Sequence, residues 1–331
     1  MPDHALLGPW IKRFLLEYLA IERNLSPNTR ASYRDMLVQL LPYAARHVGR
    51  SVDRLVITDL GPTLVRAFLS DIEDTRHCSA ATRNQRLAGI HALARFIGEN
   101  SPEHVEWCTQ IRLIPFKKTT QGDVSYLDES QMNALLAAPD RSSSQGRRDY
   151  ALLLFLYNSG ARATEACTVR ITDIDWHLLS VRLLGKGNKY RACPLWPRTI
   201  EQLRLCAGSR HAEELLFVNR NGQPMTRFGI HTMVERHAAN AAIQISSFSG
   251  KKVSPHIIRH STATRLLRSG VDINTVRAWL GHVSINTTNI YAETDLETKA
   301  RALDTCAPDG GGKQGKRWRE QPELMTFLRT L

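Results

Sequence analysis

Two histidines flank an arginine within five residues, in the segment HIIRH from His256 to His260. Ser254 and Pro255 precede this segment, and a serine N-cap followed by proline at the first helical position is typical of a helix start. His256 and Arg259 then share one face beside the unpaired amides of a helix N-terminus, which attracts anions. The pattern therefore indicates a site that binds a phosphate group.

A zinc site is the alternative interpretation of the same histidines. His256 and His260 are four positions apart, and His282 could supply a third ligand. However, Arg259 would place a fixed positive charge against the metal, and no carboxylate stands at ligand spacing in this segment. A cluster of arginine and histidine with the downstream Tyr291 suits a phosphate better, so we expect no metal and no other cofactor.

The elements that must position these side chains are mainly helices. Asp272 can cap an amphipathic helix that ends at Gly281, and a further short helix is expected from about Ser284. The apolar segment DYALLLFLYNSG predicts a buried helix that ends at Gly160. The one strong strand signal is SVRLLGKGNKYRACPL, in which two apolar runs flank a Gly-Lys-Gly-Asn turn and predict a β-hairpin.

The first hundred residues predict a helical domain. The segments that follow Ser26 and Ser79 combine a capping residue with apolar residues at helical spacing. Polar and basic side chains at the starts of these two helices suit contacts with DNA phosphates, although a solvated helix face explains any single arginine equally well. The candidate DNA-contacting residues are Asn28, Thr29, Arg30, Arg83, Asn84 and Arg86.

The composition is that of a globular protein with excess positive charge. Of 331 residues, 42% are hydrophobic, and the formal net charge of +12 suits a polyanionic partner such as nucleic acid. No apolar run approaches the ~20 residues that a membrane helix needs. The six cysteines show no CxxC spacing. We therefore expect reduced thiols and a cytoplasmic, nucleoid-associated protein without membrane contact.

Five motifs, in one order along the chain, resemble those of the tyrosine recombinase (phage integrase) family. The resemblance covers roughly residues 10 to 304, because the helical N-terminal region is similar to the core-binding domain of that family. One departure is Ala161, where a larger aliphatic residue is usual, and it concerns packing. The motifs are SGARATE with Arg162 and Glu165, GKGNKYRACPL with Lys186, HIIRH with His256, Arg259 and His260, LGH with His282, and NIY with Tyr291.

The resemblance implies a mainly α fold with a small antiparallel β-sheet. A helical, SAM-like core-binding domain that binds DNA is expected over residues 1–102, a linker over 103–122, and the catalytic tyrosine recombinase domain over 123–304. Residues 305–331 would form a flexible glycine-rich tether and a C-terminal docking helix, whose apolar stripe is Leu324, Phe327, Leu328 and Leu331. This helix could dock on a neighbouring subunit or fold back on its own domain.

The resemblance also implies that the chain exchanges DNA strands at specific sites. Arg162 and Arg259 would bind the non-bridging oxygens of a DNA phosphate, where charge develops during attack. Tyr291 would be the nucleophile and would form a 3'-phosphotyrosine without ATP.

Proton transfer and orientation would fall to the remaining motif residues. His256 would act in acid-base catalysis, and Lys186 would protonate the leaving 5'-oxygen. His282 would hydrogen-bond the phosphate, while Glu165 and His260 would orient the groups that touch it.

Each assignment has an ordinary structural alternative. Arg162 and Glu165 could be a surface i,i+3 helix pair. Lys186 could be a solvated turn lysine, with Lys189 as the alternative proton donor, and Tyr291 could be a packing residue. The occurrence of all five motifs in one order favours the catalytic interpretation.

The expected partners are double-stranded DNA at recombination sites, further copies of the chain in a homotetramer on paired sites, and accessory recombinases or DNA-bending proteins. The expected setting is integration, excision or transposition of a mobile element. Three alternatives remain open: a recombinase that resolves dimers, a topoisomerase that relaxes DNA, and a DNA-binding regulator without turnover.

Overall fold

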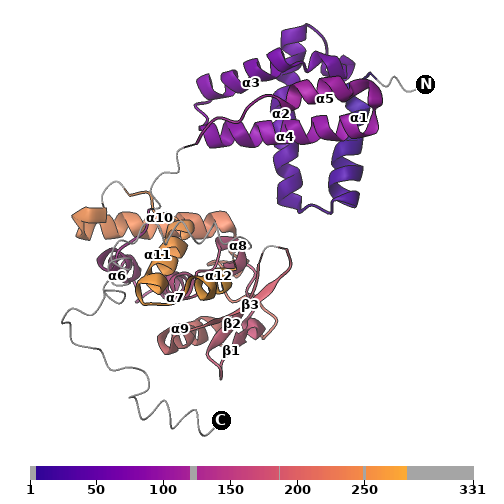
Figure 1. The fold of residues 1–331 in the computed structure, drawn as a ribbon. Helices are drawn as coiled ribbons and strands as arrows, with labels where there is room; N and C mark the ends of the chain where they lie inside the picture. The colour runs from indigo at the N-terminus through magenta and orange to yellow at the C-terminus, as the bar shows by residue number, and fades with distance from the viewer. Residues whose placement is uncertain (1–4, 120–124, 186, 249–250, 282–331) are drawn as a thin grey trace, which may run out of the picture. The chain divides into compact units, whose positions relative to one another are not determined.

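The computed structural model describes residues 5–119, 125–185, 187–248 and 251–281 (Figure 1). The chain divides into two compact units, Met1–Gly122 and Asp123–Leu331. Lys186, His282 and Tyr291 lie outside the described residues, as does the helix expected within residues 305–331. None of the helices in the described part of the chain has the length and apolar character required to cross a bilayer.

The first unit is built from helices. Ser26 and Ser79 cap α2 and α4 as predicted, because their hydroxyls accept hydrogen bonds from the backbone amides of Thr29 and Thr82. Figure 1 shows α4 and α5 side by side in this unit. Its elements are α1 (Leu7–Arg13), the π-helix η1 (Phe14–Glu22), α2 (Pro27–Val48), η2 (Val52–Arg54), η3 (Ile57–Asp59), α3 (Pro62–Asp74), α4 (Ala80–Asn100), η4 (Pro102–His104) and α5 (Val105–Arg112).

The segment expected to be a linker, residues 103–122, contains the helix α5, which follows η4 directly. Trp107, Cys108 and Ile111 of this helix, and Ile114 after it, are buried in the core of the first unit. The indole of Trp107 also donates to the carbonyl of Leu60 at 3.1 Å. The apolar spacing of these four residues is helical, but Pro115 and the lysine pair that follows it obscure the pattern.

The second unit surrounds a buried central helix. Every residue of α7 from Asp149 to Ser159 is buried, and the helix ends at Gly160 with φ of 62°, as predicted. The helices of this unit are α6 (Glu129–Ala137), α7 (Ser144–Ser159), α8 (Ala163–Ala166), η5 (Ile171–Asp173), α9 (Pro197–Ala207), α10 (Arg227–Gln244), η6 (Ser246–Phe248), α11 (Pro255–Arg268) and α12 (Ile273–Leu280).

A three-stranded antiparallel sheet in the order β1-β2-β3 completes the second unit (Figure 1). Its strands are β1 (Ile174–Asp175), β2 (Ser180–Leu184) and β3 (Tyr190–Pro194). The β2–β3 hairpin confirms the predicted one, with Leu184 opposite Tyr190 and Val181 opposite Cys193. The sequence did not predict β1, because two residues are too short to show an alternating pattern.

Helices α11 and α12 begin where their caps predict. The hydroxyl of Ser254 accepts a hydrogen bond from the amide of Ile257, and Pro255 is the first residue of α11. The carboxylate of Asp272 accepts from two amides at the start of α12, which ends at Gly281 with φ of 65°. The expected mainly α fold with a small antiparallel sheet is therefore confirmed.

Candidate active site

Three of the side chains singled out in the sequence line one cavity of about 410 Å³ in the second unit, namely Arg162, His256 and Arg259. Among the described residues that line this cavity there is no carboxylate. The excess of positive charge suits an anion. The remaining lining residues are Ala163, Thr164, Arg227, Phe228, His231, Ser254 and Pro255.

Arg259 is almost fully buried, with 1% of its surface exposed. Its Nη1 donates to the carbonyl of Gly160 at 2.7 Å, and its Nη2 donates to the carbonyl of Leu280 at 2.6 Å. These carbonyls stand at the C-terminal ends of α7 and α12, where the helix dipole is negative. The guanidinium is therefore held in one orientation by two backbone acceptors.

Arg162 precedes α8 and is partly exposed. Its Nη1 donates to Oε1 of Glu165 at 2.7 Å, and its backbone amide donates to Oε2 of the same carboxylate at 2.8 Å. The side chain of Arg162 is 31% exposed, whereas that of Glu165 is 4% exposed. The pair has the i,i+3 spacing of a surface ion pair, but its carboxylate is buried.

Sequence reasoning missed Arg191 of β3, which binds the other side of Glu165. Its Nη1 and Nη2 donate to Oε1 and Oε2 of Glu165 at 3.0 and 2.8 Å. Burial alone would raise the pKa of Glu165, but the hydrogen bonds and charge of Arg191, followed by those of Arg162, outweigh it and lower that pKa. One signal was available, because Arg191 alternates with Cys193 and so shares the buried face of the hairpin.

His256 and His260 stack edge to face one helical turn apart, with ring centroids 4.6 Å apart. Partial desolvation, followed by the charges of Arg259 and Arg162, lowers the pKa of His256. Burial, followed by His256 and Arg259, lowers the pKa of His260 to about 4. Both imidazoles are therefore neutral near pH 7, and a neutral His256 can accept a proton.

The structure describes the neighbours of Lys186 and His282 but not these residues themselves. Gly185 donates its amide to the carbonyl of Lys189 at 2.8 Å, which closes the hairpin turn that contains position 186. Gly281 ends α12 directly before position 282. In the described part of the chain, no group of three or more histidine, cysteine, aspartate or glutamate side chains is placed to hold a metal ion.

In the first unit, the starts of α2 and α4 lie close together. The side-chain amide of Gln85 donates a hydrogen bond to the hydroxyl of Ser32 at 3.0 Å and joins the two helices. Of the six candidate DNA-contacting residues, Asn28 is exposed, and Thr29, Arg30 and Arg86 are partly exposed.

The other two candidates in the first unit contact its own backbone. Arg83 is 7% exposed and donates to the carbonyl of Pro115 at 3.0 Å. Asn84 makes two hydrogen bonds with the backbone of Lys117. These two side chains hold the segment that follows α5.

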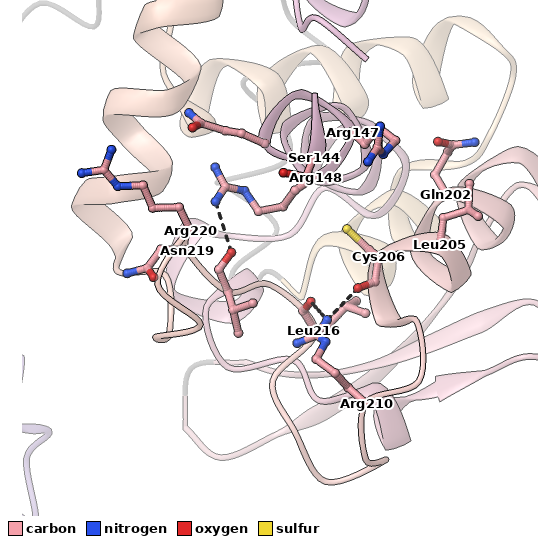
Figure 2. A pocket seen from close by; sticks show the side chains of 12 residues that line it. Ser144, Arg147, Arg148, Gln202, Leu205, Cys206, Arg210, Leu216, Asn219 and Arg220 are labelled. Atoms are coloured by element: carbon pink, nitrogen blue, oxygen red, sulfur yellow. Dashed lines mark hydrogen bonds between the residues drawn. The ribbon is translucent and has the colours of Figure 1, made fainter. Parts of the chain in front are cut away.

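A second cavity, of about 360 Å³, lies beside the N-terminal end of α7 (Figure 2). It is also rich in arginine, but two of its arginines are engaged by the protein itself. Arg148 donates to the carbonyl of Val218. Arg210 donates to the carbonyls of Cys206 and Leu216, as Figure 2 shows. Arg148 further binds the buried carboxylate of Asp149. These side chains stabilise the fold at this end of α7.

Comparisons with known proteins agree with the motifs. Residues 125–297 match the phage integrase family, and residues 11–99 match the phage integrase N-terminal SAM-like domain. The putative integrase/recombinase y4rC of Sinorhizobium fredii is 36% identical over 334 residues, which covers all of both chains. Tyrosine recombinase XerC of Pelobacter propionicus is 31% identical over 90% of this chain and 95% of its own length.

Two solved structures share the fold. The Tn1549 transposon integrase in complex with a circular intermediate DNA has a TM-score of 0.69 and 16% identity, over 88% of this chain and 98% of its own. The XerH site-specific recombinase bound to palindromic difH substrate has a TM-score of 0.67 and 23% identity, over 85% and 81%. The fold and the family matches together define a DNA recombinase. The chain belongs to the phage integrase family, that of the tyrosine recombinases.

Proposed function

We propose that this recombinase cleaves and rejoins DNA at specific sites through a covalent 3'-phosphotyrosine at Tyr291. The observation that carries the proposal is the meeting of Arg162, His256 and Arg259 at one positively charged cavity. A phosphodiester under in-line attack develops negative charge on its non-bridging oxygens, and fixed guanidiniums stabilise that charge.

The two arginines have distinct supports in this mechanism. Glu165 orients Arg162, and backbone carbonyls of Gly160 and Leu280 orient Arg259. Because both guanidiniums are held before DNA binds, little reorganisation accompanies the charge that develops in the transition state.

The proton transfers follow from the states of the remaining groups. The phenol of Tyr291 forms a bond to phosphorus while the bond from phosphorus to the 5'-oxygen breaks. A neutral His256 accepts the phenol proton, and Lys186 protonates the leaving 5'-oxygen. His282 donates a hydrogen bond to the phosphate, and His260 supports His256. Rejoining runs the same steps in reverse, with a 5'-hydroxyl as the nucleophile.

The N-terminal unit would hold the DNA. We assign the first unit, residues 1–122 with α5 included, to a DNA-binding domain and residues 123–304 to the catalytic domain. The starts of α2 and α4 would contact phosphates through Asn28, Thr29, Arg30 and Arg86, since helix N-termini and basic side chains suit that role. Arg83 and Asn84 would support the same surface by holding residues 115–117. Recombination on paired sites calls for four subunits, with residues 305–331 as the segment that links them.

A mobile-element function, in integration, excision or transposition, is the first candidate for the biological role. The full-length match to a protein named as a putative integrase/recombinase supports it. Resolution of DNA dimers, by the same chemistry, is the second candidate. A relative that matches over most of its length, tyrosine recombinase XerC, is named a recombinase and not an integrase, which supports a role other than integration. Circular substrates that carry either the two ends of an element or two tandem plasmid copies would distinguish these roles by their products.

The covalent intermediate can be tested directly. The protein is incubated with a nicked duplex that carries a candidate recombination site, and a protein–DNA adduct that survives denaturant is scored. We expect an adduct with the native chain, none with Tyr291→Phe, and an unchanged yield with the control Tyr43→Phe in the first unit. An adduct of normal yield with Tyr291→Phe would show that another residue is the nucleophile.

A further inference from the structure

Arg191 is the buried arginine at the centre of a hydrogen-bond network beside the candidate active site. Its side chain is 9% exposed. Besides the paired hydrogen bonds to Glu165, its Nε donates to the carbonyl of Trp279 at 2.8 Å. A single guanidinium on β3 therefore binds both α8 and α12.

Through Glu165, Arg191 acts on Arg162. Oε1 of Glu165 accepts hydrogen bonds from both guanidiniums, and Oε2 accepts from Arg191 and from the backbone of Arg162. A carboxylate that is 4% exposed stays ionised only if cations stabilise it. The contact of Arg191 thus sets both the charge and the position of the group that orients Arg162.

Through α12, Arg191 acts on the same helix end that binds Arg259. The carbonyl of Trp279 accepts from Arg191, and the next carbonyl, of Leu280, accepts from Arg259. A Cβ atom on Gly281 would lie 3.1 Å from Cδ and Nη1 of Arg191, so the arginine packs against the residue before position 282.

Arg191 also lies beside the start of the hairpin turn. A Cβ atom on Gly185 would lie 3.4 Å from Nη1 of Arg191 and 3.6 Å from Oε1 of Glu165. The glycine therefore allows the ion pair to approach the backbone directly before position 186.

We infer that Arg191 is a positioning residue of this recombinase, which fixes Arg162 through Glu165 and fixes the end of α12 that Arg259 also binds. The inference rests on the proposed function, in which these two arginines bind the DNA phosphate. Arg191 itself is not among the described residues that line the cavity of Arg162, His256 and Arg259. Lysine cannot replace it fully, because three donors in a planar fork match three separate oxygens, whereas an ammonium group offers all its donors from one nitrogen.

The main test measures chemistry and DNA binding separately. Single-turnover formation of the Tyr291 adduct is followed at saturating protein on the nicked duplex, and DNA affinity is measured on the same duplex without reaction. We expect Arg191→Gln to slow adduct formation by about 10²-fold, on the scale of losing one oxyanion donor, with DNA affinity within about threefold. Arg191→Lys should retain an intermediate rate.

The matched control is Arg182→Gln on the neighbouring strand β2. Arg182 forms an ion pair with Asp173 at 3.5 Å, but its side chain is 62% exposed. The same change of residue type on the same sheet should leave the adduct rate unaltered. Thermal melts of each variant establish the fraction folded, and rates are compared per folded molecule.

A double-mutant cycle separates a positioning role from a merely structural one. If Arg191 acts on Arg162 through Glu165, the double variant Arg191→Gln with Glu165→Gln should be faster than the product of the two single effects predicts. Multiplying effects would show that the two residues act independently and would overturn the inference. A normal rate for Arg191→Gln per folded molecule would also overturn it.

Failure of the proposed function is distinguishable from failure of this inference. If the native chain forms no Tyr291 adduct, the proposed function falls. The contact between Arg191 and Glu165 is then tested by a ¹³C titration that measures the pKa of the Glu165 carboxyl group. The described neighbours of this group include Arg162, Arg191 and the thiol of Cys193. We expect a higher pKa of Glu165 in Arg191→Gln than in the native chain, and an unchanged pKa would overturn the inference.

Discussion

Arg259 and Leu280 are joined by a 2.6 Å hydrogen bond from a buried guanidinium to the last carbonyl of α12. The same guanidinium binds the carbonyl of Gly160 at the end of α7. A residue proposed to bind phosphate thus also holds two helix ends together. Substitution at this position should therefore affect stability as well as reaction rate.

We expect Arg259→Lys to lower both the stability of the second unit and the reaction rate. The ammonium group cannot reach both carbonyls in the same geometry, so the free energy of unfolding of the second unit should fall by about 3 kcal/mol. Adduct formation should slow by about 10²-fold. Urea unfolding and the nicked-duplex assay check these values. Arg204→Lys is the control, since Arg204 is exposed and stacks on Trp176, and its stability should change by less than about 0.5 kcal/mol.

Gly160→Ala should destabilise the second unit more than Gly270→Ala. Both glycines have positive φ, 62° and 84°, which costs a residue with a side chain about 1 kcal/mol. A Cβ atom at Gly160 would also lie 2.5 Å from Cδ2 of Leu280, whereas Gly270 has open space around it. Overpacking adds about 1–3 kcal/mol. Equal losses in urea unfolding would show that the contact with Leu280 relaxes without cost.

Acid should destabilise the second unit partly through His260. Its pKa is lowered to about 4 in the folded chain, below its ordinary value of about 6.5 in the unfolded chain. Between these values the unfolded state binds more protons, so stability rises with pH there. The contribution of His260 is complete above about pH 6.5 and is lost as the pH falls through about 4. We expect His260→Gln to flatten this part of the stability profile, measured by urea unfolding at several pH values, and a parallel profile would contradict the assignment.

Asp149→Asn should be among the most destabilising single changes in the second unit. The carboxylate is 1% exposed and accepts hydrogen bonds from Arg148, Arg236 and His237, which ties α7 to α10. Removing its charge leaves the largely buried guanidinium of Arg148, 15% exposed, without its carboxylate, which costs about 3–5 kcal/mol. Urea unfolding measures this loss. The control Glu235→Gln removes the exposed pair with His231 on α10 and should cost less than about 1 kcal/mol.

Local signals predicted the helix boundaries that frame the site. Capping by Ser254 and Asp272 and the terminating glycines Gly160 and Gly281 act within a few residues, so they are visible in the sequence. The motifs likewise named Arg162, His256 and Arg259, which the structure brings to one cavity. The catalytic interpretation of these residues rested on the order of all five motifs and not on any single motif.

The parts that sequence reasoning missed depend on distant contacts. Arg191 binds Glu165 across 26 positions and Trp279 across 88, and no local pattern reports such pairs. Asp149 binds His237 across 88 positions in the same way. The short helix α5 was missed because it has few apolar positions and stands between Pro102 and Pro115. Its burial becomes evident only when α4 is placed against it.

Helix α12 is attached to the rest of the catalytic unit in part through main-chain oxygens, those of Trp279 and Leu280, and every amino acid supplies such an oxygen. Side-chain replacements along the exposed face of α12 therefore leave the acceptors intact as long as the helix persists. The donors are different, because each is one particular guanidinium. Substitutions on the exposed face of α12 should therefore be tolerated. Substitutions of Arg191 and Arg259, which donate to these carbonyls, should not be tolerated.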